Sequence, residues 1–119
     1  MRELETVQKQ GKLNNVIAMD VKGNGNGNHL YNVTSLTDGK LLLQVPFQDG
    51  ARNQEGSNPG VLDADLLEIV RDRLVGFQSG DYATEDNQKA LEHVEEALAY
   101  MNARVEERIA RNVLGTSEF

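Results

Sequence analysis

The chain has 119 residues, a formal net charge of -7 and no cysteine. Its length is that of one domain of ordinary size, so we expect a single domain over residues 1–119. The negative charge argues against a protein that coats DNA or RNA, and the lack of cysteine excludes disulfides, thiol nucleophiles and cysteine metal sites. No apolar run approaches about 20 residues, and the first residues do not resemble a signal peptide, so we expect a cytosolic protein without a membrane partner.

Three short apolar runs predict a small antiparallel β-sheet over about residues 13–47. They are Asn15–Val21, His29–Leu36 and Lys40–Val45. Residues 1–12 are polar, which indicates either a frayed end or a sheet edge. Asp38-Gly39 is a strong signal for a hairpin turn between the last two strands, and Pro46 should end the pairing of the last one.

Two segments of this half are irregular. After Lys22, residues 23–28 alternate Gly and Asn, which tolerate positive φ and predict a turn. They do not complete a phosphate-binding glycine loop, because Asn28 stands where the motif needs its last glycine and no helix follows. Residues 50–60 form a long loop without periodicity, and loops of this length are often functional. Arg52 is the only cation of this loop and is either a ligand contact or a solvated residue.

The C-terminal half, about residues 61–114, has the periodicity of two amphipathic helices. Asp63 is expected to cap the first helix, whose apolar stripe ends at Phe77. The chain then reverses, and Thr84 or Asp86 is expected to cap a second helix that runs from about Glu85 to Asn112. The predicted fold class is therefore α+β: a small N-terminal antiparallel β-sheet followed by a C-terminal antiparallel two-helix hairpin.

The second helix has an apolar seam that becomes basic near its end. The seam consists of Leu91, Val94, Leu98, Met101 and Val105. Arg108 takes the next position of the seam, Arg104 lies one turn before it and Arg111 about one turn after it. Gly115 is expected to stop the helix. Such a cluster is either a helix terminus that balances its dipole or an anion-binding site, and spacing alone leaves both interpretations open.

No catalytic motif is evident. His29 and His93 lie far apart on different elements, and neither has neighbours at the spacing of metal ligands. We find no nucleophile motif and no acid–base pair. The chain is interpreted as a binding protein rather than an enzyme, with no cofactor and no metal.

The spacing of the candidate residues has a geometric consequence. Phe77 and Asn87 flank the turn of the hairpin, whereas Arg104 and Arg108 lie at the far end of the second helix. About 26 Å of helix separates Asn87 from Arg104 at about 1.5 Å per residue. One small ligand cannot contact both ends within one protomer. A site that uses both ends would need two antiparallel hairpins, and a two-fold dimer would then hold two identical sites.

Two motifs carry a family resemblance over roughly residues 47–116. The first reads L-x-x-V-x-D-R-L-x-x-F-Q-x-G from Leu67 to Gly80, with Asn87 ten residues after Phe77. The second begins with VEEAL at 94–98 and continues with Arg104, Arg108, Arg111 and the VLGT sequence at 113–116. In these residues the chain resembles the Thoeris anti-defence proteins of bacteriophages. Their helical hairpin is shared with the phage cyclic-oligonucleotide sponges that block CBASS immunity.

The resemblance implies a function and a ligand. It implies a sponge that acts in the cytoplasm of the infected bacterial host. Such a sponge sequesters, without cleavage, a glycocyclic ADP-ribose made by TIR-domain Thoeris enzymes. Some members of the family also bind CBASS cyclic oligonucleotides. The alternatives are an enzyme that degrades the same signal and a structural oligomeric interaction protein.

The resemblance also assigns roles to residues. Phe77 stacks on adenine, Asn87 makes polar contacts, and Arg104 and Arg108 hold the base and the pyrophosphate. Arg111 and Arg52 are further candidate ligand-binding residues. The implied assembly is a homodimer, or a hexamer built as a trimer of dimers.

Overall fold

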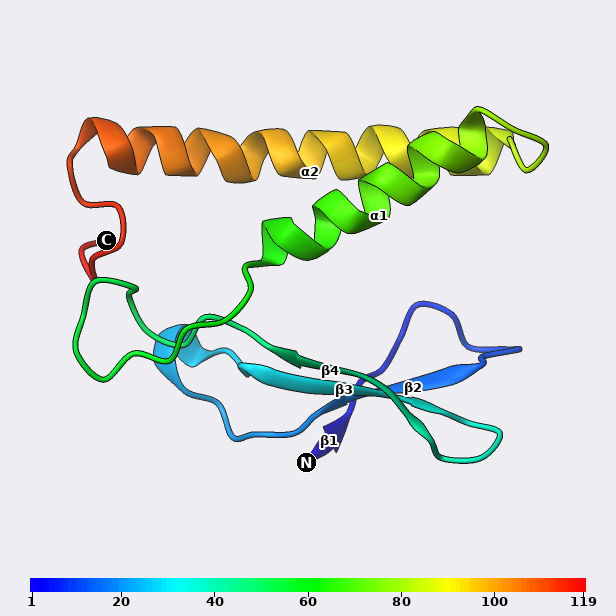
Figure 1. The fold of residues 1–119 in the computed structure, drawn as a ribbon, viewed down its shortest axis with the longest axis horizontal. Helices are drawn as coiled ribbons and strands as arrows, with labels where there is room; N and C mark the ends of the chain where they lie inside the picture. Colours follow the sequence, from blue (N-terminus) through cyan, green and yellow to red (C-terminus); the bar gives the residue numbers. More distant parts are fainter. The chain divides into compact units, whose positions relative to one another are not determined.

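The computed structural model describes all 119 residues and divides into two compact units, Met1–Val61 and Leu62–Phe119 (Figure 1). The first unit contains all four strands and the second contains both α-helices. The order of elements confirms the predicted α+β fold class, with the antiparallel sheet first and the helical hairpin second.

The first unit is an antiparallel sheet with the strand order β1-β2-β3-β4. The strands are β1 Arg2–Glu3, β2 Asn14–Ala18, β3 Leu30–Ser35 and β4 Leu41–Pro46. The three predicted strands are therefore confirmed, and β1 shows that residues 1–12 contribute a sheet edge. Val33 lies at the centre of the register, opposite Val16 on one side and Leu43 on the other. The residues of this unit with the least exposure are Ala18 at 0% and Val45 at 7%.

The Gly- and Asn-rich segment forms the predicted turn and contains the short 3-10 helix Asn24–Asn26. Gly25 and Asn26 have φ values of 69° and 65°, the left-handed region that these residue types tolerate. The turn is held by Asp20, whose carboxylate accepts the N–H of His29 at 2.9 Å and the side-chain amide of Asn28 at 3.1 Å. The His29 bond is the main reason why the pKa of Asp20 lies below its usual value.

The hairpin between β3 and β4 turns at Asp38-Gly39 as predicted. Gly39 has a φ of 72°, and its N–H donates to the Ser35 carbonyl at 2.9 Å. Strand β4 ends at Pro46, as predicted, and Pro46 is itself the last paired residue of the strand. Pro46 lies opposite Leu30, and its carbonyl accepts the N–H of Val61 at 2.9 Å. Proline lacks only the donor of a ladder bond, so its carbonyl still pairs.

The second unit is the helical hairpin, formed by α1 Asp63–Gln78 and α2 Glu85–Ala110. The prediction that Asp63 caps α1 was wrong: the cap position is Leu62, and the Asp65 carboxylate accepts the Leu62 N–H at 2.8 Å. Thr84 caps α2 as predicted, because its hydroxyl accepts the Asn87 N–H at 3.0 Å.

The end of α2 comes earlier than predicted. The helix stops at Ala110, before Gly115 is reached, and Asn112 adopts a φ of 60°. Asparagine tolerates this left-handed conformation better than most residues, which explains how the helix ends without glycine. Neither helix combines the length and the apolar character that a membrane-spanning segment requires.

The two helices pack along the predicted seam and run in opposite directions (Figure 1). Leu91 is the most buried residue of this unit, with 7% of its surface exposed. Gln78 closes the turn, since its side chain donates to the Thr84 carbonyl and accepts the Thr84 N–H, both at 3.0 Å. These bonds fix the turn that precedes the start of α2.

Candidate ligand-binding site

An aromatic pair lies at the turn of the hairpin. The rings of Phe77 and Tyr82 meet edge to face with their centroids 6.2 Å apart, and the guanidinium of Arg73 lies 5.2 Å from the centre of the Phe77 ring. Phe77 is 37% exposed and Tyr82 75% exposed. The turn therefore presents aromatic surface together with a cation, a combination that suits a planar anionic ligand.

Asn87 lies in the first turn of α2, close to this pair. Its backbone N–H serves the Thr84 cap, and its side-chain amide donates to the Tyr82 carbonyl at 3.5 Å. A bond of this length is weak, so a ligand could replace it. The structure thus brings Asn87 to the same end of the hairpin as Phe77.

Three arginines lie at the opposite end of α2, where they contact the C-terminal segment Val113–Phe119. Arg108 donates four hydrogen bonds to main-chain carbonyls. The acceptors are Glu118 at 2.6 Å, Phe119 and Val113 at 3.0 Å, and Thr116 at 3.1 Å. Arg108 is half-buried, which is consistent with this number of partners.

The other two arginines contact the end of the same segment. The guanidinium of Arg104 lies 5.5 Å from the centre of the Phe119 ring. Arg111 is paired with Glu107 on its own helix and also donates to the Phe119 main-chain oxygen at 2.9 Å. The predicted cluster of three arginines is therefore brought together, and its partners are an aromatic ring, main-chain oxygens and the Glu107 carboxylate.

Arg52 belongs to the first unit and stabilises its own loop. Its guanidinium donates to the Gln48 side-chain oxygen at 2.9 Å and to the Gly60 carbonyl at 3.3 Å. The same Gln48 oxygen accepts the Gly60 N–H at 3.3 Å, so these residues close the base of the 50–60 loop. Arg52 is exposed, and its contacts support a structural role in the loop.

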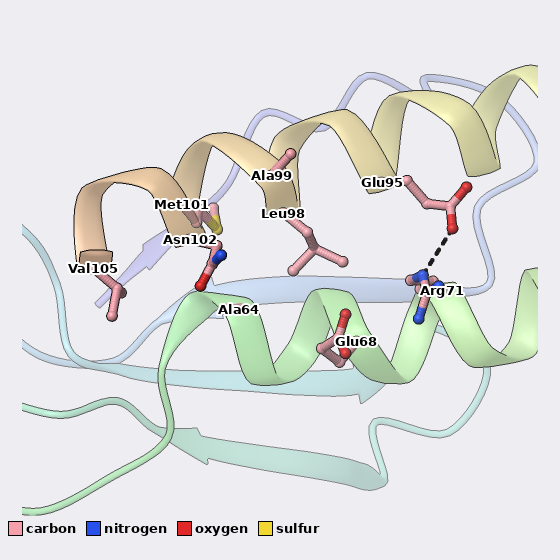
Figure 2. A pocket seen from close by; sticks show the side chains of 9 residues that line it. All are labelled: Ala64, Glu68, Arg71, Glu95, Leu98, Ala99, Met101, Asn102 and Val105. Carbon is pink, nitrogen blue, oxygen red and sulfur yellow. Dashed lines mark hydrogen bonds and ion pairs between the residues drawn. The ribbon is translucent and has the colours of Figure 1, made fainter. Parts of the chain in front are cut away.

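A groove runs between the two helices, and the sequence did not predict it (Figure 2). Its volume is about 480 Å³, and the residues that line it are Ala64, Glu68, Arg71, Glu95, Leu98, Ala99, Met101, Asn102 and Val105. Figure 2 shows Arg71 and Glu95 facing each other across the groove, joined by an ion pair of 2.9 Å. The pair raises the pKa of Arg71 above its usual value. Apolar seam residues thus remain accessible in an unpaired hairpin.

Sequence reasoning also missed Arg73 and Phe119. Arg73 is four residues before Phe77 on α1, and this i, i+4 spacing could have indicated the stacked pair. Phe119 lies in a segment without periodicity, so no local pattern relates it to Arg104.

These features define a small α+β protein built around a helical hairpin with aromatic residues at one end and cations at the other. Residues 44–106, from the end of β4 into the last part of α2, match the family model described as Acb2/Tad1, hairpin domain. A relative, Thoeris anti-defense 1 of Bacillus phage SBSphiJ7, is 37% identical over 94 residues. The alignment covers 79% of this chain and 66% of the relative, just under two thirds of its length. The chain belongs to the Acb2/Tad1 hairpin family, which confirms the predicted kinship with phage Thoeris anti-defence proteins.

Proposed function

We propose that this protein is a phage anti-defence sponge that binds a glycocyclic ADP-ribose made by TIR-domain Thoeris enzymes and holds it without cleavage. The observation that carries the proposal is that the motif arginines of this family member, Arg104, Arg108 and Arg111, gather at one end of α2. The name of the related phage protein, Thoeris anti-defense 1, supports the same function.

The chemistry of the arginine cluster fits a nucleotide. A guanidinium offers a planar face that stacks on a base and a fork of N–H donors that matches phosphate oxygens. Arg104 already lies against an aromatic ring, and Arg108 already donates to several oxygens. In the proposed site Arg104 and Arg108 hold the base and the pyrophosphate, and Arg111 supplies a further donor. Phe77 stacks on adenine, and Asn87 supplies polar contacts.

The proposed site is shared between two chains of a homodimer. The Phe77 end and the Arg104 end lie about 26 Å apart along α2, at about 1.5 Å per residue, which exceeds the reach of one small ligand. An antiparallel second hairpin would bring each turn to the arginine end of its partner. The groove between α1 and α2 offers a place for this contact, because its apolar lining includes Val105, which is 39% exposed. The larger assembly in this proposal is a hexamer made as a trimer of dimers.

A structural role for the arginines is a second candidate, because Arg108 donates to the carbonyls of Val113 and Thr116 just beyond the helix. Such bonds satisfy free carbonyls after a helix end whether or not a ligand binds. The two roles make different predictions for binding, so a direct binding experiment separates them.

The decisive experiment recovers the signal after binding. Excess protein is incubated with glycocyclic ADP-ribose until a TIR-activated effector no longer responds, then heat-denatured and filtered. A sponge returns the original mass and nearly full effector activation. Recovery of a hydrolysed or isomerised product would instead identify an enzyme, and a signal that is never depleted would favour the structural role. A variant with both Arg104→Ala and Arg108→Ala serves as the non-binding control.

A further inference from the structure

The C-terminal segment Val113–Phe119 consists of two parts that are held in different ways. Near the helix, Thr116 forms its own turn, since its N–H and its hydroxyl both donate to the Val113 carbonyl at 3.1 Å and 2.5 Å. The last two residues, Glu118 and Phe119, contact the arginines through their main-chain oxygens and the Phe119 ring. The Glu118 N–H also donates to the Thr116 hydroxyl at 3.2 Å, which joins the two parts. Release of Glu118 and Phe119 from the arginines does not require the bonds between Thr116 and Val113 to break.

The contacts that this terminal part makes with the arginines are of the same kinds as those a bound nucleotide would make. An aromatic ring lies over the guanidinium of Arg104, where a base would stack. Main-chain oxygens accept from Arg108 and Arg111, where phosphate oxygens would bind. Glu118 adds a negative charge to the same segment, and that charge would repel an anionic ligand.

We propose that Glu118 and Phe119 are an internal occupant of the arginine cluster, an autoinhibitory contact that an aromatic anionic ligand must displace. The identity of that ligand rests on the function proposed above, whereas the competition between the segment and an anion does not. The contact is suited to release, because Phe119 is 91% exposed. Its ring lies against the guanidinium of Arg104, and its main-chain oxygen accepts from Arg108 and Arg111. If the cluster binds ligand only after release, the apparent affinity is lowered by the fraction of molecules in which the segment is released.

The first test needs no cyclic nucleotide. The ¹⁵N relaxation of the Phe119 amide reports whether the segment is ordered, and the probe is inorganic pyrophosphate. We expect pyrophosphate to increase the mobility of Phe119, whereas sodium chloride at the same ionic strength has a smaller effect. Arg108→Gln should release the segment without any anion, and the matched variant Arg52→Gln in the other unit should not. A Phe119 amide that stays ordered at saturating pyrophosphate overturns the proposal.

The second test uses the proposed ligand and two substitutions at one position. Phe119→Ala removes the ring and should bind glycocyclic ADP-ribose about 3- to 10-fold more tightly, mainly through faster association. Phe119→Tyr keeps the ring and should bind like the wild type. Unchanged or weaker binding by Phe119→Ala contradicts the proposal, since the segment would then be neutral or would help to hold the ligand. If pyrophosphate releases the segment but no variant binds glycocyclic ADP-ribose, the proposed function fails and the autoinhibitory contact stands.

Discussion

The spacing of Arg108 allowed two interpretations, a residue that stabilises a helix end and a residue that binds an anion, and one side chain can serve both. Its guanidinium donates to the Val113 and Thr116 carbonyls, as a residue that stabilises a helix end would do. It also donates to the oxygens of Glu118 and Phe119, the two residues that we propose a ligand displaces. A guanidinium has five N–H donors, so it can keep the first pair of bonds and replace the second pair with bonds to a ligand. The helix-end and anion-site roles are therefore compatible in this residue.

Substitutions of the two arginines should separate binding from stability. Arg104→Ala should weaken binding of glycocyclic ADP-ribose by roughly 2–4 kcal/mol, because a charged contact is lost from the site. Its effect on the melting temperature should be small, since the Arg104 guanidinium lies against the exposed Phe119 ring. Arg108→Ala should weaken binding by a similar amount and also lower the melting temperature, since four main-chain oxygens each lose one donor.

Isothermal calorimetry and thermal melts without ligand measure the two effects. Lys89→Ala is the control, because Lys89 forms only an exposed ion pair with Glu85 at the other end of α2. Arg108→Lys keeps the charge but loses the fork, so it should fall between the wild type and Arg108→Ala. Wild-type affinity in either alanine variant would show that the ligand binds elsewhere.

At the scale of elements, the sequence predicted the helices and turns that depend on residues close together in the chain. The apolar stripe that ends at Phe77 and the apolar seam of the second helix predicted the two helices, and the Asp38-Gly39 pair predicted the hairpin between β3 and β4. The boundaries were less predictable. Asp63 and Asp65 both resemble a cap, and only the geometry shows that Asp65 accepts the Leu62 N–H. The sequence grouped the three arginines correctly but not their partners, because the segment after Ala110 has no repeating pattern and folds back through main-chain oxygens.

The turn between β2 and β3 should respond to acid. Asp20 has a lowered pKa in the folded chain, first because it accepts the N–H of His29, so protonation weakens the folded turn. The stabilisation is present above the ordinary carboxyl pKa and is lost as the pH falls through the lower folded value. We expect the melting temperature of Asp20→Asn to vary less with pH than that of the wild type at and below about pH 4. Melts between neutral and acidic pH measure this, with Asp63→Asn as a control on α1, and parallel curves for the wild type and Asp20→Asn would contradict the assignment.

At the scale of the whole molecule, a single copy of the chain buries few of its residues. The residues with less than a tenth of their surface exposed are Ala18, Val45 and Leu91, and none of them is large and fully buried. The hairpin has only one of these, Leu91, although α2 has a seam along much of its length. A second copy that covers the groove between α1 and α2 would bury more of that seam, and the same pairing would complete the proposed ligand site.

Mixing two defective variants tests this shared site directly. Phe77→Ala removes the proposed stacking residue, and a chain with Arg104→Ala and Arg108→Ala removes the proposed cations. Each homodimer should bind glycocyclic ADP-ribose poorly, because both of its sites lack one half. After subunit exchange, a heterodimer pairs an intact Phe77 turn with an intact arginine end at one of its two sites.

Binding should then return with a stoichiometry near one ligand per heterodimer, measured by calorimetry while native mass spectrometry follows the exchange. As a control, one chain carries all three substitutions and is mixed with the wild type. Neither site of that heterodimer is intact, so only the remaining wild-type dimers should bind the ligand. If exchange is complete and the mixture of the two defective variants still does not bind, the two halves do not meet across a dimer.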